Sequence, residues 1–435
     1  MDDLLIINAM LLPLTSAAAA IIHPGFVRIK GDRILQLGAM VRLDAGVAAR
    51  RTLDAAGMVV MPGLINGHTH APMTLFRGLA DDLPLMTWLQ EHIFPAEARW
   101  VTPAMVYWCA KLAAAEMLRA GTTCVADGYF HEEAVAAAFL DAGLRAVAAQ
   151  GIIDFPAPGV ADPADNVDAA ARFIENWRKD TLIRPAAFCH SPYTCSPATL
   201  QQAKAMTRRL GTKLFIHLAE TREEADQCQA RFGLSPVRHL DRLGVLDSDT
   251  VCVHCVWLDN GDLDILAARG AAVITCPRSN MKLAVGTAPL TEMLSRNIPV
   301  GLGTDSCASN NALDLFNEMG TAARLHKVHS LTPTTLPARQ VLQLATRGGA
   351  QALGLEAEIG SLTPGKKADL LLLDCQTPEL TPFHHQDLLV YAASGHNVRN
   401  TIINGRLVME NRTILSFDLE ETMHRVRELA DRLNR

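Results

Sequence analysis

Residues 62–70 read Pro62-Gly63-Leu64-Ile65-Asn66-Gly67-His68-Thr69-His70, and they follow an apolar run over residues 58–61 that is typical of a short buried strand. Alternate residues of a strand point to the same face, so His68 and His70 can direct both imidazoles at one point. Imidazole is a common protein ligand for zinc and also binds iron. Because a lone pair of this kind is weak evidence, the remainder of the chain decides whether it marks a metal site.

Length and composition indicate a globular chain. It has 435 residues, of which 49% are hydrophobic and 20% charged, and its formal net charge is −6. This charge gives no electrostatic reason to expect a nucleic acid or an anionic membrane as a partner. No apolar run is long enough for a membrane span, and no signal peptide is recognised. The ten cysteines are scattered, which favours reduced thiols in a cytoplasmic protein.

The middle of the chain, residues 58–365, alternates short apolar strands with amphipathic helices. Strand candidates end at eight places, in order near Ile65, Ala126, Ala149, His190, His217, His254, Thr275 and Gly303. Strands that alternate with helices indicate parallel βα units, and eight such units predict a (β/α)8 TIM barrel. A doubly wound sheet would need a glycine-rich phosphate turn after its first strand, where this chain carries the two histidines.

The two ends of the chain have a different pattern. Residues 1–57 and 366–416 contain short strand patterns and tight turns, among them Asn404-Gly405, which is typical of a β-hairpin. We expect these two segments to form one small composite β-sandwich domain. Apolar residues at near-helical spacing predict a C-terminal helix over residues 417–435.

Polar residues gather at the predicted strand ends, which is where a TIM barrel carries its chemistry. In strand order they are His68 and His70, Asp127, His190, His217, His254 and Asp305. Any one of these histidines could be a hydrogen-bonded core residue, but the whole set is better explained by a functional site.

We predict that this site holds one divalent metal ion, with zinc preferred and iron as the alternative. His68, His70 and His217 supply three nitrogen ligands, and Asp305 supplies an oxygen, because the eighth strand of a barrel lies beside the first. A metal there would lower the pKa of a bound water, and Asp305 could accept its proton. The fourth strand offers no lysine for a carboxylated bridge between two metals, which favours a single ion.

Two further residues are candidates for proton transfer. His254 could hold the attacking water or polarise the electrophile. Glu220 follows His217 by three residues and, when protonated, could serve as general acid for a ring nitrogen next to the attacked carbon. A solvated or helix-capping glutamate is an equally good interpretation of Glu220 from the local sequence.

Several motifs can be taken together. They are Pro62-Gly63-Leu64-Ile65-Asn66-Gly67-His68-Thr69-His70, Leu85-Met86-Thr87-Trp88-Leu89 with Pro95-Ala96-Glu97, His190-Ser191-Pro192-Tyr193, His217-Leu218-Ala219-Glu220, and Gly303-Thr304-Asp305 with Ala308-Ser309-Asn310-Asn311. With these motifs the chain resembles the amidohydrolase superfamily over nearly its whole length. Within that superfamily it looks most like the 5-methylthioadenosine/S-adenosylhomocysteine deaminases and the related triazine hydrolases.

The resemblance implies the metal ligands given above, Glu220 as the proton shuttle and His254 as the partner of the attacking water. It also implies that Glu97 and His190 contact a nucleoside through its ribose hydroxyls. From the local sequence alone, Glu97 would be a surface glutamate of a helix. Family habit further suggests a homodimer or homotetramer.

The segment 77–93 is the candidate for a loop over the site. Within it, Trp88 could line the substrate pocket or could anchor the loop on the barrel, and the second interpretation is slightly favoured.

One departure from the family pattern bears on the substrate. Members that accept the homocysteine nucleoside tend to carry an arginine at the end of the third strand, where it would pair with the amino-acid carboxylate. This chain has Gln150-Gly151 at that point, and Arg145 lies within the strand. With Gln150 as a substrate contact, we therefore expect 5′-methylthioadenosine, or adenosine, to be preferred over S-adenosylhomocysteine.

The expected activity is hydrolytic deamination of an adenine nucleoside, which is hydrolysis of a carbon–nitrogen bond in a cyclic amidine with release of ammonia. The alternative keeps the site and changes the ring to a guanine-like base, a cytosine-like base or a chloro-s-triazine. Glu97 and His190 favour a substrate that bears a sugar. A non-catalytic barrel would be expected to lack metal ligands, and all of them are present here.

Overall fold

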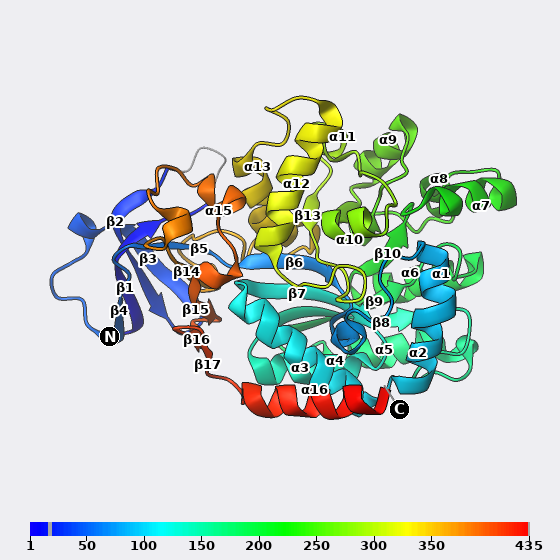
Figure 1. Ribbon diagram of the computed structural model, residues 1–435, viewed down its shortest axis with the longest axis horizontal. Helices are drawn as coiled ribbons and strands as arrows, with labels where there is room; N and C mark the ends of the chain where they lie inside the picture. The colour runs from blue at the N-terminus through cyan, green and yellow to red at the C-terminus, as the bar shows by residue number, and fades with distance from the viewer. Residues whose placement is uncertain (16–19, 434–435) are drawn as a thin grey trace.

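The structure of the protein, a computed structural model, describes residues 1–15 and 20–433. Its described strands form two sheets, one with nine strands and one with eight. In Figure 1 the nine-stranded sheet lies at the left, and the eight-stranded sheet lies to its right among the helices. No helix in the described part of the chain is both long and apolar enough to cross a membrane.

The eight-stranded sheet is parallel throughout, with the order β13-β12-β11-β10-β9-β8-β7-β6. Its strands are β6 (Leu64–Thr69), β7 (Thr122–Tyr129), β8 (Arg145–Ile152), β9 (Ile183–Cys189), β10 (Leu214–Leu218), β11 (Thr250–His254), β12 (Ala272–Thr275) and β13 (Val300–Leu302). The sheet closes where the last strand meets the first, since Asp305 N donates to His68 O at 3.0 Å. The predicted (β/α)8 barrel is confirmed.

Helices follow the strands and surround the barrel (Figure 1). They are α3 (Pro103–Arg119), α4 (Glu132–Ala142), α5 (Asn166–Trp177), α6 (Pro197–Leu210), α7 (Arg222–Phe232), α8 (Pro236–Arg242), α9 (Asn260–Arg269), α10 (Pro277–Lys282), α11 (Leu290–Ser295), α12 (Leu315–Ser330), α13 (Ala338–Gln343) and α14 (Gly349–Ala352). Side-chain caps start several of them: the hydroxyls of Thr102, Ser196 and Thr221 each accept a hydrogen bond from a backbone N–H in the first turn.

The inside of the barrel is a packed core. Phe188, Phe215 and Ile274 point inward with other small and branched residues of the strands, and all are buried. Leu353 and Ile359, which follow α14, belong to the same cluster. The interior is therefore filled below the strand ends, which leaves their carboxyl ends as the place for a cavity.

The nine-stranded sheet is built from both ends of the chain, because β14 near the C-terminus pairs antiparallel with β5. Its strands are β1 (Asp2–Leu11), β2 (Ile22–Lys30), β3 (Arg33–Ala39), β4 (Ala49–Asp54), β5 (Met58–Pro62), β14 (Leu370–Asp374), β15 (Val398–Ile403), β16 (Arg406–Glu410) and β17 (Thr413–Ile414). This composite sheet completes the predicted fold class.

The apolar run before the histidine pair lies in this composite sheet. β5 hydrogen-bonds to β1 and β14, whereas β6, the next strand along the chain, belongs to the barrel. Gly63 separates them, and a Cβ there would lie 1.8 Å from Thr123 Oγ1. The division into residues 1–57 with 366–416, 58–365 and 417–435 remains a proposal, and we place its first junction at Gly63.

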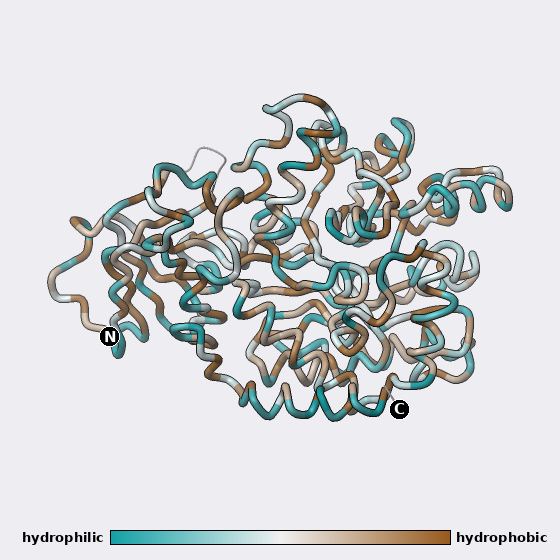
Figure 2. Tube along the Cα trace, viewed as in Figure 1, coloured by the Kyte–Doolittle hydropathy of each residue, from teal (hydrophilic) through white to brown (hydrophobic). Residues whose placement is uncertain are grey.

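The helix α16 (Leu419–Leu433) packs on α3 along one edge of the molecule (Figure 1). It is largely hydrophilic (teal in Figure 2), as expected of a surface helix with one apolar stripe. It accounts for the predicted C-terminal helix, of which residues 434–435 lie outside the described part of the chain.

The segment between β6 and α3 is helical in most of its length. A 3-10 stretch (Ala71–Phe76) follows β6, and α1 (Leu85–Thr87), a π-helical stretch (Trp88–Ile93) and α2 (Phe94–Trp100) come next. The predicted loop over residues 77–93 thus contains two helical stretches and leads directly into α2, which carries Glu97.

Candidate metal centre and substrate cavity

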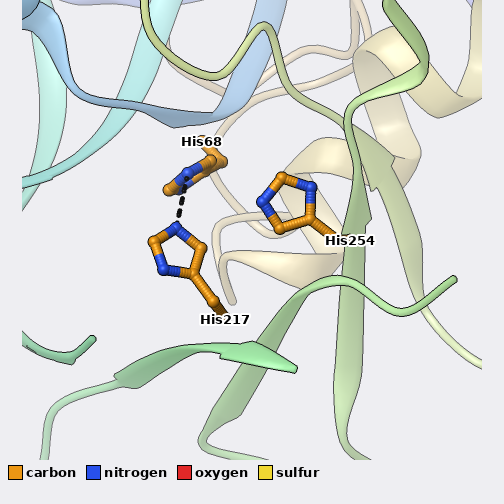
Figure 3. Close-up of side chains that lie close together, drawn as sticks. All are labelled: His68, His217 and His254. Carbon is orange, nitrogen blue, oxygen red and sulfur yellow. Dashed lines mark hydrogen bonds between the residues drawn. The ribbon is translucent and has the colours of Figure 1, made fainter. Parts of the chain in front are cut away.

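The carboxyl ends of the barrel strands bring the four predicted metal ligands together. His68 Nε2 lies 3.3 Å from His217 Nε2 and 3.4 Å from Asp305 Oδ1, and His70 Nε2 lies 3.5 Å from the same Asp305 oxygen. Figure 3 shows His68 and His217 with their rings directed at one another and His254 beside them. His68 lies in the buried strand β6 and His217 lies in β10, so the barrel itself fixes their positions.

These spacings fit a single divalent metal ion. Ligand atoms of a tetrahedral site with bonds of about 2.0–2.1 Å lie about 3.3–3.4 Å from one another. The three distances given above match this value. The donors form two compact groups that share His68, one with His70 and Asp305 and the other with His217 and His254. Three imidazole nitrogens with one carboxylate oxygen are also a common donor set for a catalytic metal, so the residues present fit such an ion.

The protonation states suit metal binding as well. Burial lowers the pKa of His68 to about 3 and holds the pKa of His217 well below its ordinary value. Burial alone would raise the pKa of Asp305, but the hydrogen bond with His68 and the nearby His70 and His254 outweigh it and hold that pKa well below the ordinary range. Neutral imidazoles and an ionised carboxylate are the forms that bind a metal.

Outer contacts orient the ligands. His70 Nδ1 lies 2.5 Å from Gly128 O, so a proton on Nδ1 leaves Nε2 free to coordinate. Asp305 Oδ2 accepts hydrogen bonds from the hydroxyls of Ser279 and Ser309, each at 2.6 Å, which turns Oδ1 toward the histidines. The sequence did not assign these contacts, because the three partners come from separate parts of the chain: Gly128 from β7, Ser279 from α10 and Ser309 from the segment after β13.

Asp127, at the end of the second strand, supports the ligands from behind. Its Oδ1 accepts hydrogen bonds from the Thr69 hydroxyl at 2.6 Å and from Ala71 N at 2.5 Å. It therefore holds the turn that carries His68 and His70 and is not one of the clustered donors.

Glu220 and His254 lie together beside the ligands. His254 Nε2 is 3.8 Å from Glu220 Oε1, and both side chains are buried. Burial raises the pKa of Glu220. Burial by itself would lower the pKa of His254, but the charges of Glu220 and Asp305 outweigh it and raise that pKa. A protonated glutamate next to a cationic or neutral imidazole can exchange protons with a substrate.

The position of Glu220 decides between the two interpretations of its sequence. Thr221 caps α7, since its hydroxyl accepts from Glu224 N at 3.0 Å. Glu220 is therefore not the cap, and its side chain lines the cavity. The backbone is in the left-handed region at Ala219 (φ 51°), His254 (φ 71°) and Asp305 (φ 59°), which is typical of residues held in place for function.

A cavity opens above the metal ligands. Glu97, His190 and Trp88 line it together with Glu220, His254 and Asp305. Much of the remaining wall is apolar and includes Leu85, Leu89, Phe94, Phe188, Ile153 and Tyr193. Among residues 1–15 and 20–433, no lysine or arginine lines it.

Individual predicted contacts can now be placed. Trp88 is buried and lines the cavity, so it both packs in the core and faces the substrate space. His190 Nδ1 lies 2.9 Å from the Thr194 hydroxyl, which fixes the ring. Glu97, which the local sequence suggested was on the surface, is buried, and Tyr129 donates its hydroxyl to Glu97 Oε1 at 2.6 Å.

Gln150 lies outside this cavity. Its side-chain oxygen accepts from Glu132 N at 3.1 Å, and it lines a separate groove on the other side of the strand. Its neighbour Gly151 lines the cavity, whereas Gln150 does not. Arg145 is also remote, because its guanidinium forms a buried ion pair with Asp369 at 2.6 Å. Neither position 150, which is an uncharged glutamine, nor Arg145 therefore places a positive charge at the cavity.

Comparison with known proteins gives related chains over the full length. The family model described as the amidohydrolase family matches residues 59–408. A 5-methylthioadenosine/S-adenosylhomocysteine deaminase of Syntrophobacter fumaroxidans is 49% identical over 98% of this chain and 98% of its own. A 5′-deoxyadenosine deaminase of Methanosarcina mazei is 43% identical over 100% of both chains. The crystal structure of an adenosine deaminase from Xanthomonas campestris with bound zinc has a TM-score of 0.97 and 37% identity, and the match covers 100% of this chain and 99% of that one.

Proposed function

Because this chain belongs to the amidohydrolase family, we propose that it removes the 6-amino group of an adenine nucleoside by hydrolysis, with 5′-methylthioadenosine preferred. Relatives at 42–49% identity carry names for deaminases of such nucleosides. The observation that carries the proposal is the convergence of the donor cluster, Glu220 and Glu97 on one cavity.

In this reaction water adds to the ring carbon that carries the 6-amino group, and that group leaves as ammonia. A divalent ion held by His68, His70, His217 and Asp305 would make a water molecule acidic enough to attack at neutral pH. We propose zinc for this ion, which the related Xanthomonas campestris structure contains, and iron as the alternative.

The chain's own residues move the protons. Asp305 accepts a proton from the attacking water, and His254 orients that water and stabilises the charge that develops on its oxygen. Glu220 donates its proton to the ring nitrogen next to the attacked carbon, which makes that carbon more electrophilic. The 6-amino group then takes the proton held by Asp305 and leaves as ammonia. The hydroxyl on the same carbon returns its proton to Glu220 and becomes a carbonyl, so both carboxyl groups recover their starting forms.

The chemistry of the cavity wall supports the preferred substrate. The amino-acid part of S-adenosylhomocysteine carries a carboxylate, and burying it without a cationic partner is unfavourable. In the part of the chain that the structure describes, apolar residues line the cavity and no lysine or arginine does. A methylthio or methyl group at the 5′ position suits such a wall.

We also propose a cytoplasmic homo-oligomer, a dimer or tetramer. All ten cysteines are free and buried, which suits a reducing compartment. Light scattering of the purified protein measures its oligomeric state.

The test is ammonia release by zinc-loaded protein with 5′-methylthioadenosine, 5′-deoxyadenosine, adenosine, S-adenosylhomocysteine and guanine in parallel. Glu220→Ala should abolish turnover, and Glu223→Ala, which alters an exposed residue in the first turn of α7, should not. Turnover of 5′-methylthioadenosine at least about tenfold above S-adenosylhomocysteine in kcat/KM is expected. Turnover of guanine, a cytosine-like base or a chloro-s-triazine without any nucleoside would replace the proposal by its alternative.

A further inference from the structure

Tyr129 and Glu97 form an isolated polar pair in the cavity wall. Tyr129 is the last residue of β7, and its hydroxyl donates to Glu97 Oε1 at 2.6 Å. The side chains come from a barrel strand and from α2, which lies in the segment that follows β6. Both residues are buried, with 5% and 7% of their surface exposed, and both line the cavity.

The second carboxylate oxygen of Glu97 is available to a ligand. Within the described part of the chain, Tyr129 is the hydrogen-bond partner of the Glu97 side chain, and that bond occupies Oε1. Oε2 is not among the buried polar atoms that lack partners, and Glu97 faces the cavity. The arrangement is thus a carboxylate fixed on one side and open on the other.

We propose that Tyr129 is a positioning residue that orients Glu97 to accept hydrogen bonds from the 2′- and 3′-hydroxyls of the substrate ribose. This rests on the proposed function, since it assumes an adenine nucleoside in the cavity. The ribose contact of Glu97 belongs to that proposed function. The new element is Tyr129, which touches the carboxylate and sets how strongly the sugar hydroxyls are held.

The hydroxyl of Tyr129 also affects the protonation of Glu97. Burial raises the pKa of Glu97 to about 7, and the hydrogen bond from Tyr129 opposes that rise. A carboxylate accepts hydrogen bonds from both hydroxyls of a diol, whereas a protonated carboxyl has less capacity to accept. The phenol therefore keeps Glu97 in its accepting form as well as in its place.

The ring of Tyr129 is packed independently of its hydroxyl. Its centroid lies 5.4 Å from that of Phe130 and 6.3 Å from that of His70. Tyr129→Phe consequently removes the donor and keeps the aromatic contacts. Tyr107→Phe is the matched control, because the Tyr107 hydroxyl also donates to a carboxylate, that of exposed Asp141.

The experiment compares adenosine with 2′,3′-dideoxyadenosine in steady-state kinetics of the zinc-loaded wild type, Y129F and Y107F. Loss of one hydrogen bond to a charged group is worth about tenfold in binding. Y129F is expected to raise KM for adenosine about tenfold, with kcat within about twofold. KM for the dideoxy nucleoside should stay within about twofold in both variants.

The outcomes separate the two levels of inference. A wild type that turns over neither nucleoside contradicts the proposed function. If the wild type is active and Y129F raises KM equally for both nucleosides, or for neither, Tyr129 does not act through the diol and the inference is wrong.

A pair of Glu97 variants tests the same point without altering Tyr129. Glu97→Gln keeps a side chain of the same length, whose carbonyl can still accept from the Tyr129 hydroxyl. Glu97→Asp is shorter and cannot reach the phenol and the sugar together. With its carbonyl held by Tyr129, the Gln side chain turns its N–H2 group toward the sugar and cannot accept from it. Both variants should therefore raise KM for adenosine and leave KM for the dideoxy nucleoside within about twofold. An equal rise for both nucleosides would overturn the inference.

Discussion

The carboxylate of Glu224 holds the backbone of Glu220 in the active conformation. Its two oxygens accept hydrogen bonds from Ala219 N at 2.9 Å and from Glu220 N at 2.8 Å. Glu224 is buried, and burial raises its pKa to about 7. The turn at Ala219 has a left-handed backbone, so the side chain of Glu224 compensates a conformation that is unfavourable by itself.

Glu224→Gln should therefore slow the chemical step. The amide offers one acceptor for two backbone donors and places an N–H2 group against the other N–H, so the orientation of Glu220 is lost in part. We expect kcat to fall about tenfold or more while KM changes by less than about threefold. Steady-state ammonia release measures both constants. Glu223→Gln, on the exposed face of α7, should match the wild type, and an equal loss in both variants would contradict this role of Glu224.

Removal of the metal should abolish activity and lower thermal stability, because a ligand that binds only the folded state stabilises it. Chelation is expected to eliminate ammonia release, and added zinc should restore it. His217→Ala should reduce the bound metal measured by elemental analysis, since it removes one of the clustered donors. His424→Ala, which changes an exposed histidine of α16, should keep the wild-type metal content. Full metal content in H217A would show that the donor set is misassigned.

The buried carboxyl group of Glu318 should make the stability of the fold depend on pH. Burial raises its pKa from 4.5 to about 8 in the folded protein. Between these two values the folded state binds more protons than the unfolded state, so stability falls as pH rises through this window. From pH 6 to pH 9 this one group accounts for about 2–3 kcal/mol. Glu318→Gln should show a smaller drop in melting temperature over that range than the wild type, and an unchanged drop would count against the buried acid as its cause.

The ion pair of Arg145 and Asp369 should matter for stability and not for substrate choice. Arg145 Nε donates to Asp369 Oδ2 at 2.6 Å, and the same carboxylate accepts from Asn404 N at 2.7 Å. The pair joins the barrel to the composite sheet. Arg145→Met leaves a buried carboxylate without its partner, so we expect about 3–5 kcal/mol of destabilisation in chemical denaturation. The ratio of kcat/KM for 5′-methylthioadenosine and S-adenosylhomocysteine should stay unchanged in the folded variant, and a shifted ratio would place Arg145 at the site after all.

The sequence alone predicted the barrel, the composite β domain and the cluster of metal ligands. These features depend on local periodicity, since alternating strands and helices determine the barrel and strand ends determine where His68, His217 and Asp305 meet. The apolar run before His68 was recognised as a strand, but only hydrogen bonding placed it in the other sheet. Pairing partners far apart in the chain leave no mark in a local pattern.

The substrate side of the site was decided by the tertiary structure. Glu97 belongs to a helix that the local sequence describes as exposed, and it is buried only because the segment after β6 folds over the strand ends. Tyr129 and Glu224 were not predicted at all, since their roles exist only through contacts with Glu97 and Glu220. Gln150 has the expected strand position, yet its side chain turns away from the cavity. Sequence periodicity tells which strand end a residue occupies, whereas the packing of neighbouring elements decides which residues face the substrate.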